Sequence, residues 1–356
     1  MNYVGIDYHK QYSHVTAVNK EGHILRSQRL SNDVPSWQAF FAELEGPSQV
    51  VLEASRTWGT LYELLVGLEG VAGVTLAHAQ KVRAIAEAQI KTDKIDADTL
   101  AQLLRANLIP AAYIPSTATR TAKELVRQRV FLVRLRTRVK NRLHVLLDRR
   151  QVPRPAVTDL FGKRGLAYLK ALAWEGVEGE ILREQLVLLE TLNTLVKEAE
   201  RELTRLLGAD PRVQRLRTVP GLGPILAAVV ALEIDDITRF RHPAKLAAYA
   251  GLVPTTSASG GRTYHGHLLP SSNKWLRWAF VEAAWVALRH SPYCRTVFET
   301  CKRRKGPHTA AIALARRLNE IVWHVLTEQR AYEERPVHRP RAARAPTALS
   351  AALTTA

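Results

Sequence analysis

The residues in this sequence that could do chemistry are first of all four acids in its N-terminal third. Asp7 follows the apolar segment YVGI and Glu53 follows VVL, so each stands at the end of a run typical of a buried strand. Asp93 and Asp96 lie three residues apart at the start of a predicted helix and project from one face of it. If that helix packs over the sheet edge, the four carboxylates converge on a site for Mg²⁺ or Mn²⁺. Two such ions could activate the attacking oxygen and stabilise the leaving oxygen of a phosphodiester.

Three of the four acids also have a purely structural interpretation. Asp93 could be the N-cap of its helix with Asp96 at the third helical position, where acids are favoured. Glu53 could cap the segment that begins at residue 57. Asp98, five residues from Asp93, points to a different face and is left out of the predicted set. The prediction therefore depends on all four acids together.

The most unusual part of the C-terminal third is the segment 240–285. Ser259 lies in ASGGR (258–262), within a Ser/Thr/Gly-rich segment that predicts a loop flexible enough for a polyanion to come close. Three basic residues follow it and could steady the charge of a phosphate: Arg262, Lys274 and Arg277. A serine in such a loop is most often a turn residue. Other serines of the segment compete with it, namely Ser257, Ser271 and Ser272.

Residues 217–234 predict a short helix, a tight turn from Pro220 to Gly223 and a second helix, which is the layout of a helix-hairpin-helix. Gly221 and Gly223 permit backbone N–H groups to approach a phosphate at the start of the second helix. A turn with only a packing role is the alternative, and the basic context favours DNA.

The elements that must position the acids indicate an α/β domain. Strands are predicted at 3–7, 13–19, 23–30, 49–53 and 74–77, and helices at 34–45, 57–69, 80–89 and 93–106. Three strands followed by alternation (βββαβαβα) predict a mixed sheet covered by helices. Pro110 and Pro115 close this unit.

A long basic helix is predicted next, from about 119 to 149, with Leu or Val every seven residues. A second heptad-like helix runs from about 179 to 207, so the two are expected to form an antiparallel coiled-coil hairpin. Residues 120–150 hold 11 Lys and Arg against two acids. The charged face of a basic helix is usually solvated. In a helix with so few acids, however, the Lys and Arg side chains repel one another unless an anion lies along the helix. Four arginines are the predicted nucleic-acid contacts: Arg127, Arg134, Arg138 and Arg142.

The charge of the chain divides at the same point. Residues 1–116 hold 10 Lys and Arg against 12 Asp and Glu, whereas the whole chain has 51 against 33 and a net charge of +18. The basic remainder favours a nucleic-acid partner. Neither a membrane span nor a signal-peptide layout is found, so a cytoplasmic protein without a membrane partner is expected. The predicted domains are 1–116, 117–210, a mainly α domain at 211–335 and a disordered tail at 336–356.

The segments that carry the acids resemble a known family. GIDYHK at 5–10, LEASRTWG at 52–59 and KTDKIDADTLAQLL at 91–104 are similar to motifs of the DEDD type of bacterial insertion-sequence transposase. The first domain resembles a ribonuclease-H-like nuclease of the RuvC type. GLVPTTSASG at 251–260 is similar to the segment with the nucleophilic serine of this family, and Ser259 matches that serine. The residues that match the DEDD quartet are Asp7, Glu53, Asp93 and Asp96.

The resemblance implies a DNA transposase or recombinase with a serine nucleophile. Ser259 would attack a phosphodiester, form a phosphoserine link and keep the bond energy for strand exchange, beside a metal site that assists it. The family also implies a homodimer or tetramer in the bacterial cytoplasm, associated with the nucleoid. In it a structured bridge RNA pairs with donor and target DNA while basic helices hold the backbones.

Two other functions stay open. A structure-selective endonuclease of the Holliday-junction type would use the same acids with metal-activated water, which makes Ser259 dispensable. A non-catalytic nucleic-acid-binding protein would carry the acids incidentally. A sugar-kinase-like ATPase is set aside, because no Gly-rich phosphate loop follows Asp7.

Overall fold

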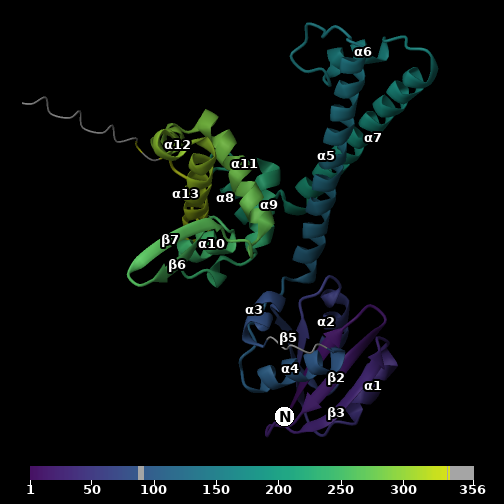
Figure 1. The fold of residues 1–356 in the computed structure, drawn as a ribbon, viewed down its shortest axis with the longest axis vertical. Coiled ribbons are helices and arrows are strands. Elements are labelled where there is room, and N and C mark those ends of the chain that lie inside the picture. Colours follow the sequence, from purple (N-terminus) through teal and green to yellow (C-terminus); the bar gives the residue numbers. More distant parts are fainter. Residues whose placement is uncertain (87–91, 335, 337–356) are drawn as a thin grey trace, which may run out of the picture. The chain divides into compact units, whose positions relative to one another are not determined.

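The chain folds into two units. In the computed structural model, which describes residues 1–86, 92–334 and 336, the first unit is Met1–Pro115 and the second begins at Ser116 (Figure 1). Apart from Pro336, the predicted tail lies outside the described residues, as does the end of the helix predicted at 80–89. Within the described ranges, no helix has the length and hydropathy needed to cross a membrane.

A five-stranded mixed sheet forms the centre of the first unit. Its order is β3-β2-β1-β4-β5 (Figure 1), in which β2 is antiparallel to both β1 and β3, while β4 is parallel to both β1 and β5. The strands are β1 (Asn2–Tyr8), β2 (Tyr12–Val18), β3 (Ile24–Ser31), β4 (Ser48–Glu53) and β5 (Val71–Ala77). The helices of this unit are α1 (Val34–Ala42), α2 (Trp58–Val66), α3 (Ala79–Ile85) and α4 (Asp93–Arg105).

Side chains along β1 alternate between the two faces of the sheet. Val4 and Ile6 belong to the apolar cluster that includes the aromatic residues of α1. Gly5 faces α4 on the other side. Asp7 follows Gly5 by two residues, so it extends from the face that α4 covers.

The predicted mixed α/β domain is confirmed. Each strand predicted for this unit begins and ends within three residues of an observed strand. The agreement has a physical basis, because apolar runs bounded by turn residues can be buried only as strands of this length.

Two long helices pack together at the start of the second unit: α5 (Thr117–Arg149) and α7 (Gly176–Leu207). They run antiparallel, because Arg129 of α5 pairs with Glu200 of α7, while Arg150 pairs with Glu178. Their contact buries Leu and Val side chains from both helices, among them Leu132, Val139, Leu143, Leu182, Leu189 and Val196. A further helix that the sequence did not indicate, α6 (Lys163–Lys170), lies in the connection. The supercoil of a coiled coil stays a prediction.

The remainder of the second unit is mostly helical, as expected. Its helices share one apolar core. They are α8 (Pro211–Leu216), α9 (Pro224–Ile234), the 3₁₀ helix η1 (Ile237–Arg239), α10 (Pro243–Tyr249), α11 (Lys274–His290), α12 (Pro292–Lys305) and α13 (Pro307–Thr327).

Two details of this part differ from the prediction. The expected Ser/Thr/Gly-rich loop is an antiparallel hairpin of β6 (Pro254–Ser259) and β7 (Arg262–Leu268). The first helix beside the Pro220–Gly223 turn lies at 211–216 rather than after Arg217. Asp210 caps that helix by accepting the N–H of Arg212, and Pro211 suits its first position.

Candidate metal centre and serine hairpin

Asp7 and Glu53 come from neighbouring parallel strands. In the register of β1 and β4, Ile6 pairs with Leu52, so the two acids are the next residues along these strands. The carboxyl ends of parallel strands meet at one edge of a sheet. The side chain of Asp7 is only 19% exposed there. The register therefore places both acids at the edge where the sequence predicted them.

Gly5 allows α4 to lie directly on β1. A Cβ at this position would lie 2.1 Å from the carbonyl oxygen of Ala97 and 2.5 Å from the backbone nitrogen of Ala101. Both atoms are backbone, so a side chain could be accommodated only if the helix moved away. This close approach carries the first turn of α4 towards the end of β1.

The first turn of α4 contains Asp93 and Asp96. Its N-cap is Thr92, whose hydroxyl accepts a hydrogen bond from the N–H of Ile95 at 3.3 Å. The alternative in which Asp93 is the N-cap is therefore wrong, and its carboxylate makes other contacts. The N-cap position of α2 is likewise held by Thr57 and not by Glu53.

A histidine joins the acids of the two elements. Nε2 of His9 lies 3.2 Å from Oδ2 of Asp7 and 3.3 Å from Oδ2 of Asp93. The hydroxyl of Tyr12 donates to the same Oδ2 of Asp93 at 3.0 Å. The guanidinium of Arg29 stacks over the Tyr12 ring, 3.6 Å from its centroid. Asp93 is thus held from β2 while it faces β1.

Burial and like charge act together on Asp7. Desolvation raises the pKa of its carboxyl, and Asp93 and Asp96 raise that pKa as well, while His9 opposes the shift. The hydrogen bond from Tyr12 holds the pKa of Asp93 below its ordinary value. A nearby cation would stabilise the carboxylate of Asp7, because its positive charge offsets both the desolvation and the repulsion from Asp93 and Asp96.

The structure brings together part of the predicted site. Among the described residues, ligand atoms that lie within 4.8 Å of one another belong to Asp7, His9 and Asp93. Asp96 is close enough to influence the pKa of Asp7, and Glu53 stands at the adjacent strand end. The sequence did not indicate His9. The available signal was its position two residues after Asp7, which favours the same side of an extended chain.

This donor set fits a divalent cation. It combines two carboxylates and an imidazole on the rim of a sheet, with Asp7 mostly buried and Asp93 43% exposed. Carboxylate oxygens are ligands of Mg²⁺ and Mn²⁺, and imidazole is a common metal ligand.

In the second unit, Ser259 is the last residue of β6 and is exposed. It pairs with Arg262 across a two-residue turn, Gly260-Gly261, in which both glycines have positive φ values of 57° and 75°. Two successive residues of this kind favour glycine and make a tight hairpin. Residues paired across a hairpin project from one face, so the hydroxyl of Ser259 and the guanidinium of Arg262 share a face.

The other two basic residues of the predicted serine site differ in exposure. Lys274 is exposed at the first position of α11. Arg277 is turned inward, since its guanidinium donates to the carbonyl of Leu269 and to the hydroxyl of Ser272. Arg277 thereby fixes the segment that leaves β7, and a phosphate contact at Arg277 stays a prediction.

A buried ionic network lies beside the start of α11. Glu233 of α9 is 7% exposed and pairs with Lys123 of α5 at 3.3 Å and with Arg127 at 3.4 Å. Its other contact is with Nδ2 of Asn273, which donates at 2.9 Å. Asn273 is the N-cap of α11, so Glu233 ties three helices to the segment that follows the serine hairpin.

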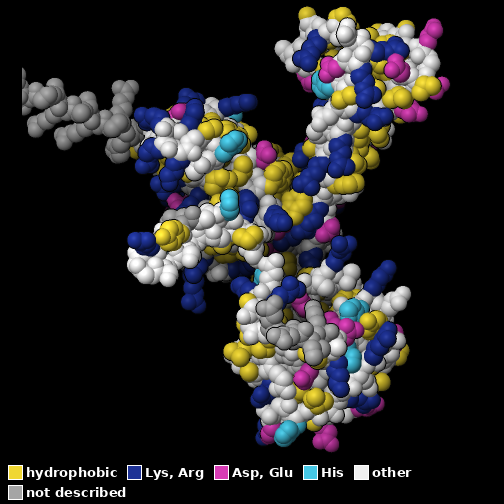
Figure 2. All heavy atoms as spheres, viewed as in Figure 1, with side chains coloured by type: hydrophobic (Ala, Val, Ile, Leu, Met, Phe, Trp, Pro, Cys, Tyr) yellow, Lys and Arg dark blue, Asp and Glu magenta, His cyan; other side chains and the backbone are white. Residues whose placement is uncertain are grey.

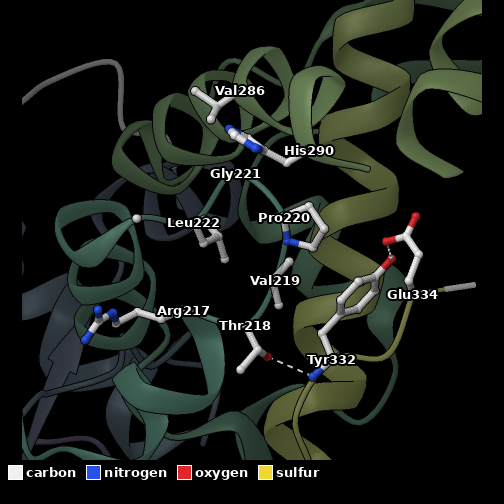
Figure 3. Close-up of a pocket in the computed structure, with 11 residues that line it drawn as sticks. Arg217, Thr218, Val219, Pro220, Gly221, Leu222, Val286, His290, Tyr332 and Glu334 are labelled. Atoms are coloured by element: carbon white, nitrogen blue, oxygen red, sulfur yellow. Dashed lines mark hydrogen bonds between the residues drawn. The ribbon is translucent and has the colours of Figure 1, made fainter. Parts of the chain in front are cut away.

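The Pro220–Gly223 turn lines a pocket of about 550 Å³ (Figure 3). Gly221, with φ of 85°, packs against α11, where a Cβ would lie 2.1 Å from the carbonyl oxygen of Ala283. Gly223 has open space around the same position and is the N-cap of α9. Arg217 and His290 also line the pocket (Figure 3). Gly221 therefore has a packing role, and Gly223 leaves backbone open to a ligand.

Lys and Arg side chains gather along the arm that α5 and α7 form (Figure 2). Arg134, Arg138 and Arg142 are exposed on α5 at four-residue spacing, which places them on one face. Within the described part of the chain they form neither ion pairs nor hydrogen bonds. Arg127, by contrast, is engaged with Glu124 and Glu233.

Known proteins match both units. A DEDD model for IS110 transposases, described as "Transposase", matches residues 4–151, and the model "Transposase IS116/IS110/IS902 family" matches residues 213–299. The chain is 28% identical over 355 residues to a probable family 20 transposase of Pseudomonas aeruginosa, covering 92% of this chain and 98% of that protein. It is 27% identical over 353 residues to the transposase of insertion sequence element IS1328 of Yersinia enterocolitica, covering 91% and 96%.

These matches and the sheet with its acidic edge define the class of protein, which is a DNA transposase. Within that class the chain is similar to the IS110-type family in both units. The match to a DEDD model favours the use of a divalent metal, and among the described residues the group of Asp7, His9 and Asp93 could hold one.

Proposed function

We propose that this protein moves an insertion sequence by cutting and rejoining DNA, with Ser259 as nucleophile and Mg²⁺ or Mn²⁺ held by Asp7, Glu53, Asp93 and Asp96. The observation that carries the proposal is the convergence of Asp7 and Asp93, from a strand end and a helix start 86 residues apart, on one potential metal site. Two carboxylates that converge repel each other, and a bound cation removes that repulsion.

The carboxylates and the serine have separate tasks. A bound divalent ion would supply charge stabilisation to the oxygens at the scissile phosphorus. Asp7 and Asp93 would hold it, and Gly5 and Tyr12 keep the two carboxylates in place.

Ser259 forms the covalent link. Its Oγ loses a proton and attacks the scissile phosphorus, the phosphodiester P–O bond breaks, and the departing deoxyribose oxygen takes up a proton. Attack by the hydroxyl of another strand then restores the serine. Arg262, on the same face of the hairpin, is placed to neutralise the phosphate oxygens.

Replacement of Ser259 by Ala tests the nucleophile. Ser259→Ala should lower strand exchange by about 10³-fold or more while DNA binding is retained, because only the attacking atom is removed. Ser257→Ala is the matched control, since Ser257 is an exposed serine of the same strand, two residues away. Mass spectrometry of the trapped protein–DNA adduct should find the phosphoester on Ser259.

The endonuclease alternative has a distinct outcome. With water as the nucleophile, no covalent adduct would form and Ser259→Ala would cut DNA at the wild-type rate. A non-catalytic binding protein would instead leave DNA processing in cells unchanged after Asp7→Ala. Either result would replace the transposase mechanism proposed for these residues.

The partners proposed for this chain are donor DNA, target DNA and a structured guide RNA, bound by a homodimer or tetramer in the bacterial cytoplasm at the nucleoid. The unpaired arginines Arg134, Arg138 and Arg142 support a polyanion along α5. Base pairing by the RNA would select sequence while the protein holds backbones. Strand exchange between paired plasmids, with and without the folded RNA encoded beside the element ends, tests the guide directly.

A further inference from the structure

His9 is a potential metal ligand outside the DEDD set. Its Nε2 lies 3.2 Å and 3.3 Å from one carboxylate oxygen each of Asp7 and Asp93. Ligand atoms at 2.0–2.2 Å from an octahedral ion lie about 3 Å apart when they are adjacent. The His9 nitrogen therefore lies from each of the two carboxylate oxygens at about the spacing of neighbouring ligands, and all three atoms lie within 4.8 Å of one another.

The position of the His9 ring is set by the fold. The backbone N–H of His9 donates to the carbonyl of Tyr12 at 3.0 Å, and its own carbonyl accepts from Nδ2 of Asn32 at 2.7 Å. Asn32 is held in turn by the hydroxyl of Ser13, which is fully buried. The His9 ring also packs on the Tyr12 ring with centroids 4.8 Å apart. Both backbone groups of His9 and one face of its ring are thus fixed.

We propose that His9 Nε2 is a direct ligand of the divalent cation, together with Asp7 and Asp93, so that this centre prefers Mn²⁺ to Mg²⁺. The proposal rests on the metal-dependent function proposed above. An imidazole nitrogen is a softer donor than a carboxylate, and it binds transition ions in preference to Mg²⁺. A site made only of carboxylates would lack this preference.

A different role for His9 would give the same contacts. As a protonated imidazolium between two carboxylates, it would be a counter-ion that leaves when a metal binds. The two roles predict opposite effects of removing the ring. A ligand strengthens metal binding, so its loss weakens binding, whereas loss of a competing counter-ion leaves metal affinity unchanged or raises it.

Manganese binding to the full chain without nucleic acid distinguishes these roles. Free Mn²⁺ is titrated by electron paramagnetic resonance, and pulsed measurements on the bound ion detect coupling to a directly bound ¹⁴N. His9→Ala should raise the Kd for Mn²⁺ by about tenfold or more and abolish the nitrogen coupling. The Kd for Mg²⁺, measured by competition, should change less.

Two further variants control for folding and for other histidines. His23→Ala changes an exposed histidine of the same unit and should leave the Kd and the coupling as they are in the wild type. His14 pairs with Asp7 in the sheet register, but its Nε2 contacts the hydroxyl of Ser27. Loss of the nitrogen coupling in His14→Ala, with the coupling kept in His9→Ala, would overturn the proposal.

The outcome is separable from that of the proposed function. An unchanged or lower Kd for Mn²⁺ in His9→Ala would refute ligation by His9, whatever the protein does to DNA. Wild-type nitrogen coupling in a protein that fails to exchange strands under every condition would uphold ligation and refute the transposase mechanism instead.

Discussion

Burial and the like charges of neighbouring acids both disfavour the ionised form of Asp7. The pKa of its carboxyl is raised first by desolvation and then by Asp93 and Asp96. In the absence of a cation, the folded state therefore binds this proton more tightly than the unfolded chain does. The stability linked to that proton is fully present below the unfolded pKa and is lost as the pH rises through the folded pKa.

Replacement of Asp7 by Asn should show this linkage. In chelator, Asp7→Asn should have a higher melting temperature than the wild type at pH 8, and the difference should shrink as the pH falls through the raised pKa. With Mg²⁺ at 100 times its Kd, the wild type should gain about 2.7 kcal/mol of stability and the variant almost none. Thermal unfolding with Mg²⁺ and with chelator measures both effects. A stabilisation by Mg²⁺ that is equal in the two proteins would remove Asp7 from the metal site.

The side chains of this centre were predictable to different degrees. The positions of Asp7 and Glu53 at the sheet edge could be predicted, because each follows an apolar run that indicates a buried strand. His9 lies just beyond the end of β1, and Tyr12 lies across the turn at the start of β2. Their contacts with Asp93 join residues more than 80 positions apart. No local pattern in the sequence encodes such a pairing.

Gly5 shows how one residue sets the distance between two elements. Its missing Cβ lets α4 contact β1 through backbone atoms. Gly5→Ala should lower the free energy of unfolding of the first unit by about 1–3 kcal/mol, the usual cost of overpacking. It should also weaken Mn²⁺ binding, since α4 carries Asp93 away from Asp7.

Gly59→Ala is the control for Gly5. Gly59 lies in α2 with no atom within 4 Å of a Cβ, so the change should be neutral or stabilise by about 0.5–1 kcal/mol. Hydrogen exchange of the β1 and β4 amides in the full chain measures both variants. Equal protection in Gly5→Ala and Gly59→Ala would show that the helix does not need the close approach.

The serine hairpin was foreseeable only in part. Gly260-Gly261 is a hairpin signal when strands flank it, yet the flanking Ser and Thr residues carry no apolar alternation. Every described side chain from Thr256 to His267 is exposed, so burial imposes no period on these strands. Their pairing depends on the turn and the backbone, which explains why the sequence indicated a loop.

The ionic network beside the start of α11 depends on Glu233. Glu233→Ala would leave Lys123, whose side chain is 11% exposed, without its partner, at a cost of about 3–5 kcal/mol. The double change Lys123→Met with Glu233→Leu should recover most of that loss, because apolar side chains can replace a buried pair. Urea unfolding of the three proteins tests the difference. A Glu233→Ala protein as stable as the wild type would show that water reaches Lys123.

The asymmetry of charge between the two units is a property of the whole chain. The first unit brings acids together at a sheet edge, while the second carries all of the excess of Lys and Arg. This difference in charge between the two units could be predicted from the composition of the sequence, because counting charged residues does not require a structure. Which arginines are available is a matter of structure, since Arg127 and Arg129 are used in ion pairs and Arg134, Arg138 and Arg142 are exposed.

The salt dependence of DNA binding should therefore identify the arginines that contact phosphates. The triple change of Arg134, Arg138 and Arg142 to Ala should reduce the slope of log K against log salt by about 2.7 for duplex DNA, since each phosphate contact contributes about 0.9. Arg201 and Arg205 of α7, each paired with a glutamate three residues earlier, provide a double Ala control whose slope should stay near that of the wild type. Fluorescence anisotropy with a random-sequence duplex from 50 to 200 mM salt measures all three proteins. An unchanged slope in the triple variant would mean that α5 faces water or protein in the complex, and the polyanion would then have to lie along another part of the second unit.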